Sequence, residues 1–266
     1  MLELEFSQVS DRGPTRQRNE DAVGSVLPET PQEIRSRGWL FAVADGVGGH
    51  GMGDVASRTA VDSARAGYRR APTTEMLTST LIRLVQQANS SVHSAALSAG
   101  PEGADMATTL VLCAMRYDRA VIAHVGDSRC YRIQKGAVSI LTKDHTIANE
   151  QRLMGLITAQ EFNSSENRHI LSRSLGKDLF ISPDVADIKL MPGDVFVLCS
   201  DGVHNGISDA ALLRIAGKGG DIALLAEEIA RHAMEQDGSD NVTVLIIRVL
   251  DVERTSMYRG RPYKIR

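Results

Sequence analysis

Four carboxylates lie at the ends of apolar stretches that have the composition of buried strands. Asp45 follows AVA, Asp127 follows HVG, Asp201 follows LCS, and Asp240 comes just before VTVLII. An acid placed where a buried strand reaches the surface loses part of its hydration, and several such acids brought together repel one another. We therefore expect a positively charged ligand among them, although any one Asp-Gly after a strand is more typical of a simple turn.

The residue types around these acids favour a hard divalent cation. His and Cys are nearly absent at ligand spacing, so oxygen ligands and Mg²⁺ or Mn²⁺ are expected in preference to Zn²⁺. Gly46 lets the backbone approach an ion closely and can supply its carbonyl oxygen. In the segment SDRGPTRQRNEDAVG, Arg16 has a planar donor fork that matches two phosphate oxygens, whereas Glu20 and Asp21 could join the metal cluster.

The pattern of apolar residues predicts the elements that must position this chemistry. Strands are expected at 39–44, 109–115, 120–125, 195–199 and 242–249, with a strand-like stretch at 22–27. Helices are expected at 54–70, 73–98, 208–216 and 221–235, with N-caps at Asp54, Thr73, Ser208 and Asp221. The strands between 109 and 141 follow one another too closely for helical crossovers, so antiparallel hairpins are expected there, with a turn at Lys135-Gly136. The order of elements favours an α+β layered sandwich, in which sheets are covered by helix pairs.

Length and composition limit the functional classes. A chain of 266 residues with 42% apolar side chains is long enough for one large core, and no linker or repeat divides it. The net charge of -3 provides no basic surface for nucleic acid. The sequence shows neither a secretion signal nor a membrane-spanning run, so we expect a cytoplasmic protein with no membrane partner. Cys113, Cys130 and Cys199 are expected to be buried, reduced thiols.

Two segments differ from the rest in composition. Residues 147–168 are polar, with Gly155 and a cap-like Thr158, and are expected to form a small surface subdomain of short helices. Residues 251–266 are basic, and we expect either a loose solvated end or a segment that docks to an acidic partner.

Eight motifs follow one another from about residue 7 to residue 249: DRGPTRQRNED, FAVADGVGGHGMGDVAS, ATTLVLCAM, IAHVGDSRCYRI, LTKDHT, HILSRSLG, VFVLCSDGV and SDNVTVLII. In this order they resemble the PPM family of Ser/Thr protein phosphatases, the protein phosphatase 2C type, in its compact bacterial form. The resemblance implies a four-layer α-β-β-α sandwich of two mainly antiparallel sheets. It also implies a catalytic domain over residues 1–250 with a flap at about 146–168, followed by the basic tail at 251–266.

The resemblance implies two core Mn²⁺ or Mg²⁺ ions bridged by a water, with a third ion beside them. Asp45, Asp201 and Asp240 would hold the first ion, and Glu20, Asp45 and the Gly46 carbonyl the second. Asp127 and Asp201 would form the third site. Asp21 would accept a hydrogen bond near the ligands, and Arg16 would bind the substrate phosphate. The implied reaction is attack of the bridging hydroxide on phosphoserine or phosphothreonine in proteins.

The chain departs from many relatives at the position of a proposed general acid. The triplet DGH of those relatives reads Asp45-Gly46-Val47 here, so the proton donor is open between His50 and a metal-bound water. Ala107 stands where many relatives have Gly, which we expect to alter local packing only. His124 and His145 are interpreted as structural, because neither has ligand-like neighbours at useful spacing.

Other interpretations of the same residues are weaker. Gly46, Gly48 and Gly51 match G-x-G-x-x-G, but Asp45 would repel a pyrophosphate at that turn. Cys113 and Arg119 have the spacing of cysteine-dependent phosphatases, but no Gly-rich loop separates them. The remaining alternatives are a catalytically silent relative that binds phosphoproteins or senses metal, and a phosphatase for one regulator, as in the sporulation-type relatives. We expect a monomer that acts on phosphorylated proteins and reverses the action of a cognate bacterial Ser/Thr kinase.

Overall fold

The structure is a computed structural model that describes residues 1–47, 52–253, 255–258 and 261–264. One sheet has the strand order β1 (Glu3–Asp11), β11 (Val242–Asp251), β10 (Val195–Cys199), β7 (Arg129–Gln134) and β8 (Ala137–Ile140). The other has the order β2 (Asp21–Val26), β3 (Trp39–Val47), β5 (Leu110–Arg116), β6 (Arg119–Val125) and β9 (Asp184–Lys189), with β4 (Ala107–Thr108) beside β3. Neighbouring strands in the described parts of these sheets run antiparallel.

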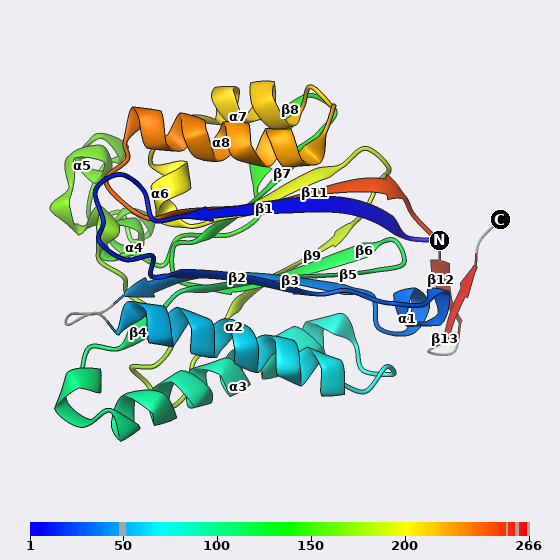
Figure 1. Ribbon diagram of the computed structural model, residues 1–266, viewed down its shortest axis with the longest axis horizontal. Coiled ribbons are helices and arrows are strands. Elements are labelled where there is room, and N and C mark those ends of the chain that lie inside the picture. The colour runs from blue at the N-terminus through cyan, green and yellow to red at the C-terminus, as the bar shows by residue number, and fades with distance from the viewer. Residues whose placement is uncertain (48–51, 254, 259–260, 265–266) are drawn as a thin grey trace.

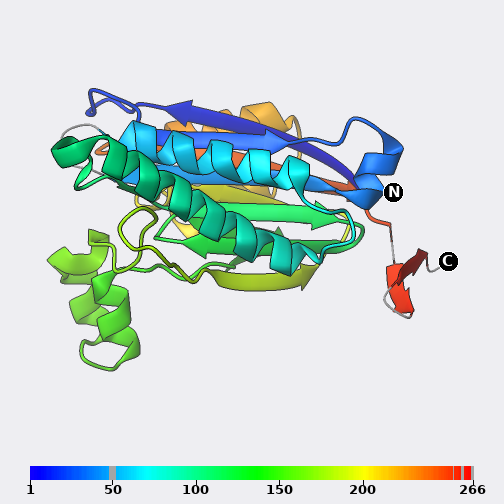
Figure 2. The same ribbon diagram turned by 90° about the horizontal axis from the view of Figure 1, so that it is seen from below.

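Helices cover the outer face of each sheet. The sheet containing β3 carries α2 (Gly53–Arg70) and α3 (Leu77–Ser98), whereas the sheet containing β11 carries α7 (Asp209–Ala216) and α8 (Ile222–Gln236). Figure 1 shows the four layers edge-on, and Figure 2 shows α3 lying across its sheet. The predicted four-layer α-β-β-α sandwich is therefore confirmed.

The central strands consist almost entirely of apolar residues, because both faces of each sheet are buried. In β3, Leu40 and Ala42 pack beneath α2 and α3, whereas Phe41 and Val43 point into the layer between the two sheets. There they meet residues of the other sheet, including Phe196 of β10. Successive side chains of a strand therefore enter two different cores, one under the helices and one between the sheets. This explains why these strands lack the alternating polar residues of a sheet with one face in solvent.

The predicted elements agree with the structure to within a few residues, and the helix starts differ most. Ser208 and Asp221 are N-caps as predicted. The N-caps predicted at Asp54 and Thr73 are wrong, because Met52 precedes α2 and Met76 precedes α3. Thr73 lies instead in a turn closed by the Glu75 amide and the Pro72 carbonyl.

The turn at Lys135-Gly136 is confirmed. Both residues have positive φ angles, 50° and 78°, which a tight two-residue hairpin requires. All three cysteines are buried and free, also as predicted.

The remaining elements are short. They are α1 (Pro31–Ser36), η2 (Gly100–Gly103), α4 (Ile147–Leu153), α5 (Ala159–Ser164), η3 (Glu166–His169), α6 (Asp201–His204), β12 (Thr255–Tyr258) and β13 (Arg261–Lys264). The predicted flap of short helices corresponds to α4, α5 and η3, and Thr158 forms a capping box with Glu161. Within the basic tail, β12 and β13 pair as a two-stranded sheet, and the choice between a solvated end and a docking segment stays a prediction. No helix among the described residues is long and apolar enough to cross a membrane.

Candidate metal centre and active site

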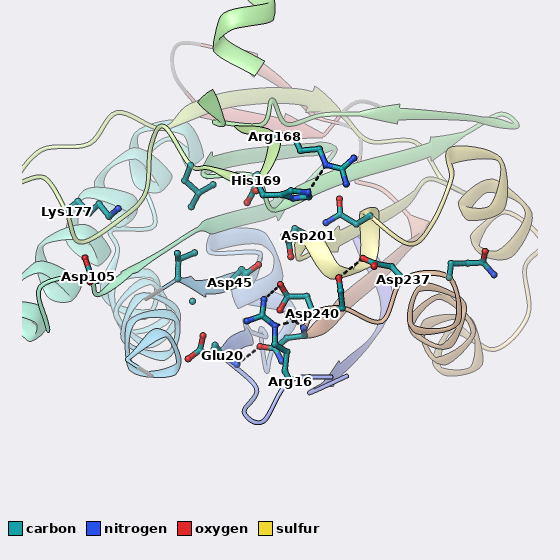
Figure 3. Close-up of a pocket in the computed structure, with 18 residues that line it drawn as sticks. Arg16, Glu20, Asp45, Asp105, Arg168, His169, Lys177, Asp201, Asp237 and Asp240 are labelled. Atoms are coloured by element: carbon teal, nitrogen blue, oxygen red, sulfur yellow. Dashed lines mark hydrogen bonds and ion pairs between the residues drawn. The ribbon is translucent and has the colours of Figure 1, made fainter. Parts of the chain in front are cut away.

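A cleft of about 840 Å³ opens at one end of the two sheets (Figure 3). It brings together residues that are far apart in the sequence. Seven of the eight residues predicted for the site line it, namely Arg16, Glu20, Asp45, Gly46, Asp127, Asp201 and Asp240. The eighth, Asp21, is adjacent, because it is the register partner of Asp45 across β2 and β3.

Each carboxylate reaches the cleft from the end of a different element. Asp45 lies near the end of β3, and Glu20 directly precedes β2. Asp201 is the first residue of α6, where an acid also interacts favourably with the helix dipole. Asp127 follows β6, and Asp240 precedes β11. Because these strands belong to both sheets, the site lies where the two layers of the sandwich meet.

The backbone of Asp45 is held by two threonines that the sequence reasoning did not assign. The Asp45 amide donates to Thr109 Oγ1 at 2.8 Å, and Thr108 Oγ1 donates to the Asp45 carbonyl at 2.8 Å. Thr109 Oγ1 also lies 2.7 Å from the Ser128 hydroxyl. Thr108 and Thr109 therefore fix the position of Asp45, and the motif ATTL is the signal that could have identified them.

Gly46 has no room for a side chain. A Cβ at this position would lie 2.0 Å from the Gly53 carbonyl oxygen, so the backbone of β3 can approach the start of α2 only without one. A Cβ on Gly53, in turn, would lie 2.8 Å from the Gly46 carbonyl oxygen and 2.9 Å from a Glu20 carboxylate oxygen. Both oxygens therefore border the same small space, as a shared cation would require.

Burial and mutual repulsion raise the pKa values of the clustered acids. The pKa of Asp45 lies well above its ordinary value, because of burial first and then the charges of Asp21 and Asp201. Burial, followed by the charge of Asp201, raises the pKa of Asp127 to about 8. Burial and then the charge of Asp240 raise the pKa of Asp201.

Two carboxylate oxygens in this cluster, Asp21 Oδ1 and Asp201 Oδ1, are buried without a hydrogen-bond partner. The other oxygen of Asp21 accepts a hydrogen bond of 2.7 Å from the Ser200 hydroxyl, and burial raises the pKa of this carboxyl to about 7. Buried carboxylates without hydrogen-bond partners destabilise the folded chain, and bound cations would offset this unfavourable free energy. The all-oxygen donor set fits Mg²⁺ or Mn²⁺.

Arg16 lines the cleft and is bound to one of the acids. Its Nη2 donates to Asp240 Oδ2 at 2.6 Å, and its Nε donates to the Ser239 carbonyl at 3.3 Å. The guanidinium is half exposed, so it borders solvent on the side from which a phosphate would arrive. The residue predicted to bind phosphate therefore lies at the mouth of the site and is paired with a predicted metal ligand.

Asn241 is a further residue that the sequence reasoning left without a role. Its Nδ2 donates to the Arg12 and Arg18 carbonyls, each at 2.8 Å, and its Oδ1 accepts from the Glu20 amide at 2.8 Å. These three hydrogen bonds fasten the loop that carries Arg16 and Glu20 to the start of β11. The sequence feature that could have identified Asn241 is its position in SDNVTV, directly after Asp240.

The residue after Gly46 cannot act as a general acid. Val47 lines the cleft at the end of β3, where its isopropyl group offers no proton. The alternative donor His50 lies outside the described residues, as do Gly48 and Gly51 of the glycine pattern. Cys113 is buried in β5 and joined by a hairpin to β6, and burial raises its pKa to about 12, which excludes a reactive thiolate.

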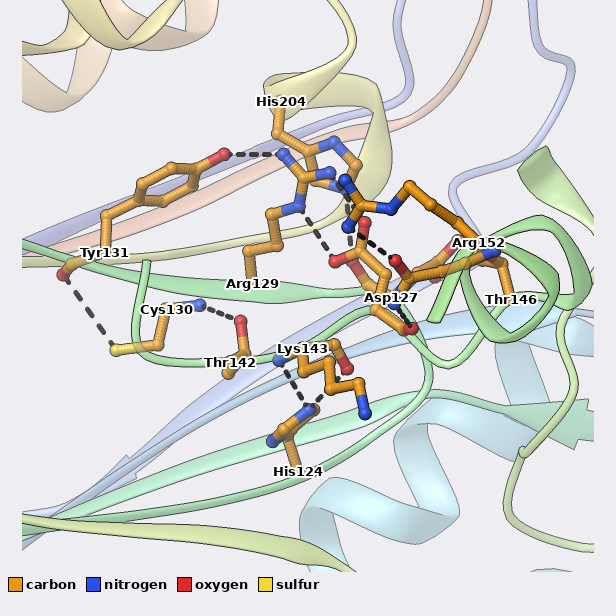
Figure 4. Close-up of polar contacts among 12 residues, drawn as sticks. His124, Asp127, Arg129, Cys130, Tyr131, Thr142, Lys143, Thr146, Arg152 and His204 are labelled. Atoms are coloured by element: carbon orange, nitrogen blue, oxygen red, sulfur yellow. Dashed lines mark hydrogen bonds and ion pairs between the residues drawn. The ribbon is translucent and has the colours of Figure 1, made fainter. Parts of the chain in front are cut away.

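His124 and His145 do have ligand-like neighbours, contrary to expectation. Their rings stack with centroids 4.7 Å apart, and one ligand atom from each lies within 4.8 Å of an Asp184 carboxylate oxygen and of the other. The Gly126 amide, however, donates to His145 Nδ1 at 3.1 Å, so the proton of the neutral ring is on Nε2, the nitrogen that faces Asp184. His124 is fixed by the backbone of Lys143 (Figure 4). Since a metal-ligating imidazole normally donates from its other nitrogen, the structural interpretation holds.

Comparison with known proteins identifies the family. A family model described as protein phosphatase 2C matches residues 15–236. The chain belongs to the protein phosphatase 2C family. It is 32% identical to the serine/threonine phosphatase stp of Listeria innocua over 95% of this chain and 96% of that protein.

Two solved structures show the same likeness. The serine/threonine phosphatase PstP/Ppp of Mycobacterium tuberculosis has a TM-score of 0.83 and 29% identity, covering 94% of this chain and 100% of the other. A PstP catalytic domain in complex with two manganese ions has a TM-score of 0.80 and 30% identity, covering 94% and 100%. The predicted family is confirmed, and with it the expectation of a metal-dependent serine/threonine protein phosphatase.

Proposed function

We propose that this protein phosphatase 2C chain hydrolyses phosphoserine and phosphothreonine in proteins at the cleft described above. In this proposal two Mn²⁺ or Mg²⁺ ions are held by Glu20, Asp45, the Gly46 carbonyl, Asp201 and Asp240. The observation that carries it is the convergence of these oxygens from both sheets, with Asp201 Oδ1 buried and unpaired. A third ion between Asp127 and Asp201 would relieve the repulsion that raises the pKa of Asp127.

Bound divalent cations would supply two things, a lowered pKa for water that they hold and neutralisation of the charge that develops on the phosphate. The protein's own residues would do the positioning. Asp45 is the ligand that the two proposed ions would share, and its backbone is fixed by Thr108 and Thr109. Ser200 orients Asp21, whose backbone pairs with that of Asp45, and Asn241 holds the loop that presents Arg16.

Arg16 is proposed to bind the substrate phosphate. Its planar fork can donate two parallel hydrogen bonds to phosphate oxygens, and it borders the cleft at the solvent side. In the structure the same fork is occupied by Asp240 and the Ser239 carbonyl. An ion that takes over the Asp240 carboxylate would therefore free Arg16 for the phosphate.

The partners proposed are phosphorylated proteins, and a cognate Ser/Thr kinase that shares its targets with this enzyme. The acidic lining of the cleft disfavours a nucleic acid backbone in the absence of cations. The predicted monomeric state and cytoplasmic location are retained as part of this proposal.

The competing hypothesis is a silent relative that binds phosphoproteins without turning them over. The intact set of acids and Arg16 favours the enzyme. With Mn²⁺ added, we expect hydrolysis of p-nitrophenyl phosphate and of phosphothreonine peptides, and a loss of about a hundredfold or more in Asp201→Asn. Asp105→Asn is the matched control, since Asp105 lines the same cleft away from the acid cluster, and it should keep nearly full activity. If metal-loaded protein turned over neither the ester nor any phosphopeptide, the binding function would be adopted instead.

A further inference from the structure

A loop at 176–181 connects the catalytic cleft with the outer face of α3. At one end of the loop Lys177 lines the cleft. At the other end Ile181 packs against the core under α2 and α3 and borders a groove of about 620 Å³ on α3. Three residues lie between these two positions, so the distance along the chain is at most about 14 Å. A polypeptide bound with one residue in the cleft can therefore reach the groove.

The loop is held firmly by side chains of α3. The Gly176 amide donates to Asn89 Oδ1 at 2.8 Å, and Asn89 Nδ2 donates to the Asp178 carbonyl at 2.8 Å. Gln86 Nε2 donates to the Leu179 carbonyl at 2.9 Å, and its Oε1 accepts from the Ile181 amide at 3.1 Å. Asn89 is fully buried. The loop conformation is thus fixed before any ligand arrives, which lowers the entropic cost of binding to it.

Two large apolar side chains of this fixed loop nevertheless point into solvent. Leu179 is 64% exposed and Phe180 is 84% exposed. A single exposed apolar residue is ordinary, but Leu179 and Phe180 are adjacent and directly precede Ile181, so the three form a short apolar strip. Ile181 borders the groove, whose other lining residues are Ile82 and polar side chains that include Arg83. Such strips commonly mark contact sites for other polypeptides.

The neighbouring face of α3 is nearly free of charge. Among residues 77–98, Arg83 is the one Lys, Arg, Asp or Glu, and it is paired with Glu75 at 2.7 Å. Most solvent-facing helices of this length carry several charges on their exposed face. Depletion of charged residues is characteristic of the centre of a protein interface.

We propose that Leu179 and Phe180 form a docking point for an apolar side chain of the phosphoprotein substrate, a few residues away from the phosphorylated residue. This inference rests on the proposed function, because it assigns the substrate to the same cleft. The substrate is the occupant that fits best, because the loop that carries Leu179 and Phe180 lines the cleft at Lys177, with only Asp178 between Lys177 and the strip. A polypeptide whose phosphorylated residue lies in the cleft therefore passes close to both apolar side chains. The enzyme would therefore prefer phosphorylation sites with Leu, Ile, Met or Phe nearby over uniformly polar ones.

The test uses phosphothreonine peptides that are identical except for Leu or Ser at positions three to eight residues on either side of the phosphothreonine. With Mn²⁺, the wild-type protein should show a kcat/KM about tenfold higher for the Leu peptide that reaches the strip. Phe180→Ala and Leu179→Ala should remove most of this preference and leave p-nitrophenyl phosphate turnover unchanged. Leu224→Ala, a 62% exposed residue of α8 on the opposite layer, is the matched control and should keep the preference.

The outcomes separate the two proposals. Equal kcat/KM for Leu and Ser peptides in wild type, with normal p-nitrophenyl phosphate turnover, would overturn the docking point and leave the proposed function standing. Loss of p-nitrophenyl phosphate turnover in Phe180→Ala, with unchanged melting temperature, would also overturn it, because the residue would then serve the cleft itself. A dimer in sedimentation velocity that Phe180→Ala dissociates would assign the strip to a second copy of the chain instead. No turnover of any ester by the wild type would remove both proposals together.

Discussion

Arg16 and Asp240 form an ion pair with 2.6 Å between Nη2 and Oδ2, so the cation proposed to bind phosphate is held by an acid proposed to bind metal. The pair is partly exposed, and its own contribution to stability is expected to be small. Its importance lies in competition, because the guanidinium and a divalent cation at the Asp240 carboxylate would repel each other at such short distance.

We expect Arg16→Gln to separate phosphate binding from metal binding. Loss of the guanidinium should raise KM for a phosphothreonine peptide by about tenfold or more, because charge-assisted hydrogen bonds to the phosphate are lost. The affinity for Mn²⁺, measured by calorimetry without substrate, should stay the same or increase, because Asp240 is released. Arg12→Gln in the same loop provides the control. A weaker Mn²⁺ affinity in Arg16→Gln would contradict the proposed competition.

Mn²⁺ should stabilise the folded chain, because the acid cluster exists only when both sheets have formed. At 100 to 1,000 times its dissociation constant, an ion that binds only the folded state adds about 2.7 to 4.1 kcal/mol to the free energy of unfolding. For a chain of this size the melting temperature should rise by several degrees and fall again with chelator. A melting curve that chelator does not change, in protein shown beforehand to contain metal, would argue against a cation site in the folded chain.

Asn241→Ala should weaken both the fold and the reaction. The variant leaves the Glu20 amide and the carbonyls of Arg12 and Arg18 without their partner, at a cost of about 2 to 4 kcal/mol in the free energy of unfolding. The loop that carries Arg16 and Glu20 is then no longer fixed, so kcat/KM should fall in protein that is still folded. Denaturant unfolding and assays at low temperature would measure the two effects separately.

Asn19→Ala is the matched control for that experiment. Asn19 lies in the same loop, where its Nδ2 donates to the Ser10 hydroxyl at an exposed position and its Oδ1 accepts from the Asp21 amide at 3.2 Å. Because it makes fewer and longer hydrogen bonds than Asn241, Asn19→Ala should lower the free energy of unfolding by less than Asn241→Ala does. Equal losses in the two variants would show that Asn241 has no special role.

His145 should make stability depend on pH below neutrality. Burial, followed by the charges of His124 and Arg173, lowers the pKa of His145 from 6.5 to about 4. The unfolded chain therefore binds a proton at higher pH than the folded one. The corresponding stability is fully present above pH 6.5, is lost as the pH falls toward 4, and amounts to about 3 kcal/mol.

The measurement compares the free energy of unfolding of wild type and His145→Asn between pH 7 and pH 4, with chelator present. The Asn side chain can still accept from the Gly126 amide but does not titrate in this range. Carboxyls with raised pKa values, such as Asp21, act in the opposite direction, so only the difference between the two proteins reports on His145. Parallel curves would show that His145 does not lose its proton affinity on folding.

The strands and helices could largely be predicted from the sequence, because most are buried on a regular period. Asp45, Asp201 and Asp240 stood out because each interrupts an apolar run at its end. Their meeting in one cleft could not be obtained from periodicity, since it depends on which strands pair. The family resemblance supplied that information.

The features that sequence reasoning missed depend on contacts between distant segments. Asn241 acts on backbone groups more than 200 residues away, and Thr109 acts on the Asp45 amide. The proximity of His124 to Asp184 follows from the register of β6 with β9, which composition does not reveal. The predicted caps at Asp54 and Thr73 were wrong because good capping residues lay near the true helix starts without occupying them.

The pairing of β1 with β11 joins two strands of one sheet that lie more than 200 residues apart in the sequence, and Asp240 lies two residues before β11. During synthesis on the ribosome, the growing polypeptide carries Arg16, Glu20 and Asp45 long before the strand that completes the sheet has emerged. β1 therefore lacks its neighbour in the sheet until β11 has been synthesised. A chain that stopped before Asp240 would therefore lack both the strand that pairs with β1 and one of the proposed metal ligands.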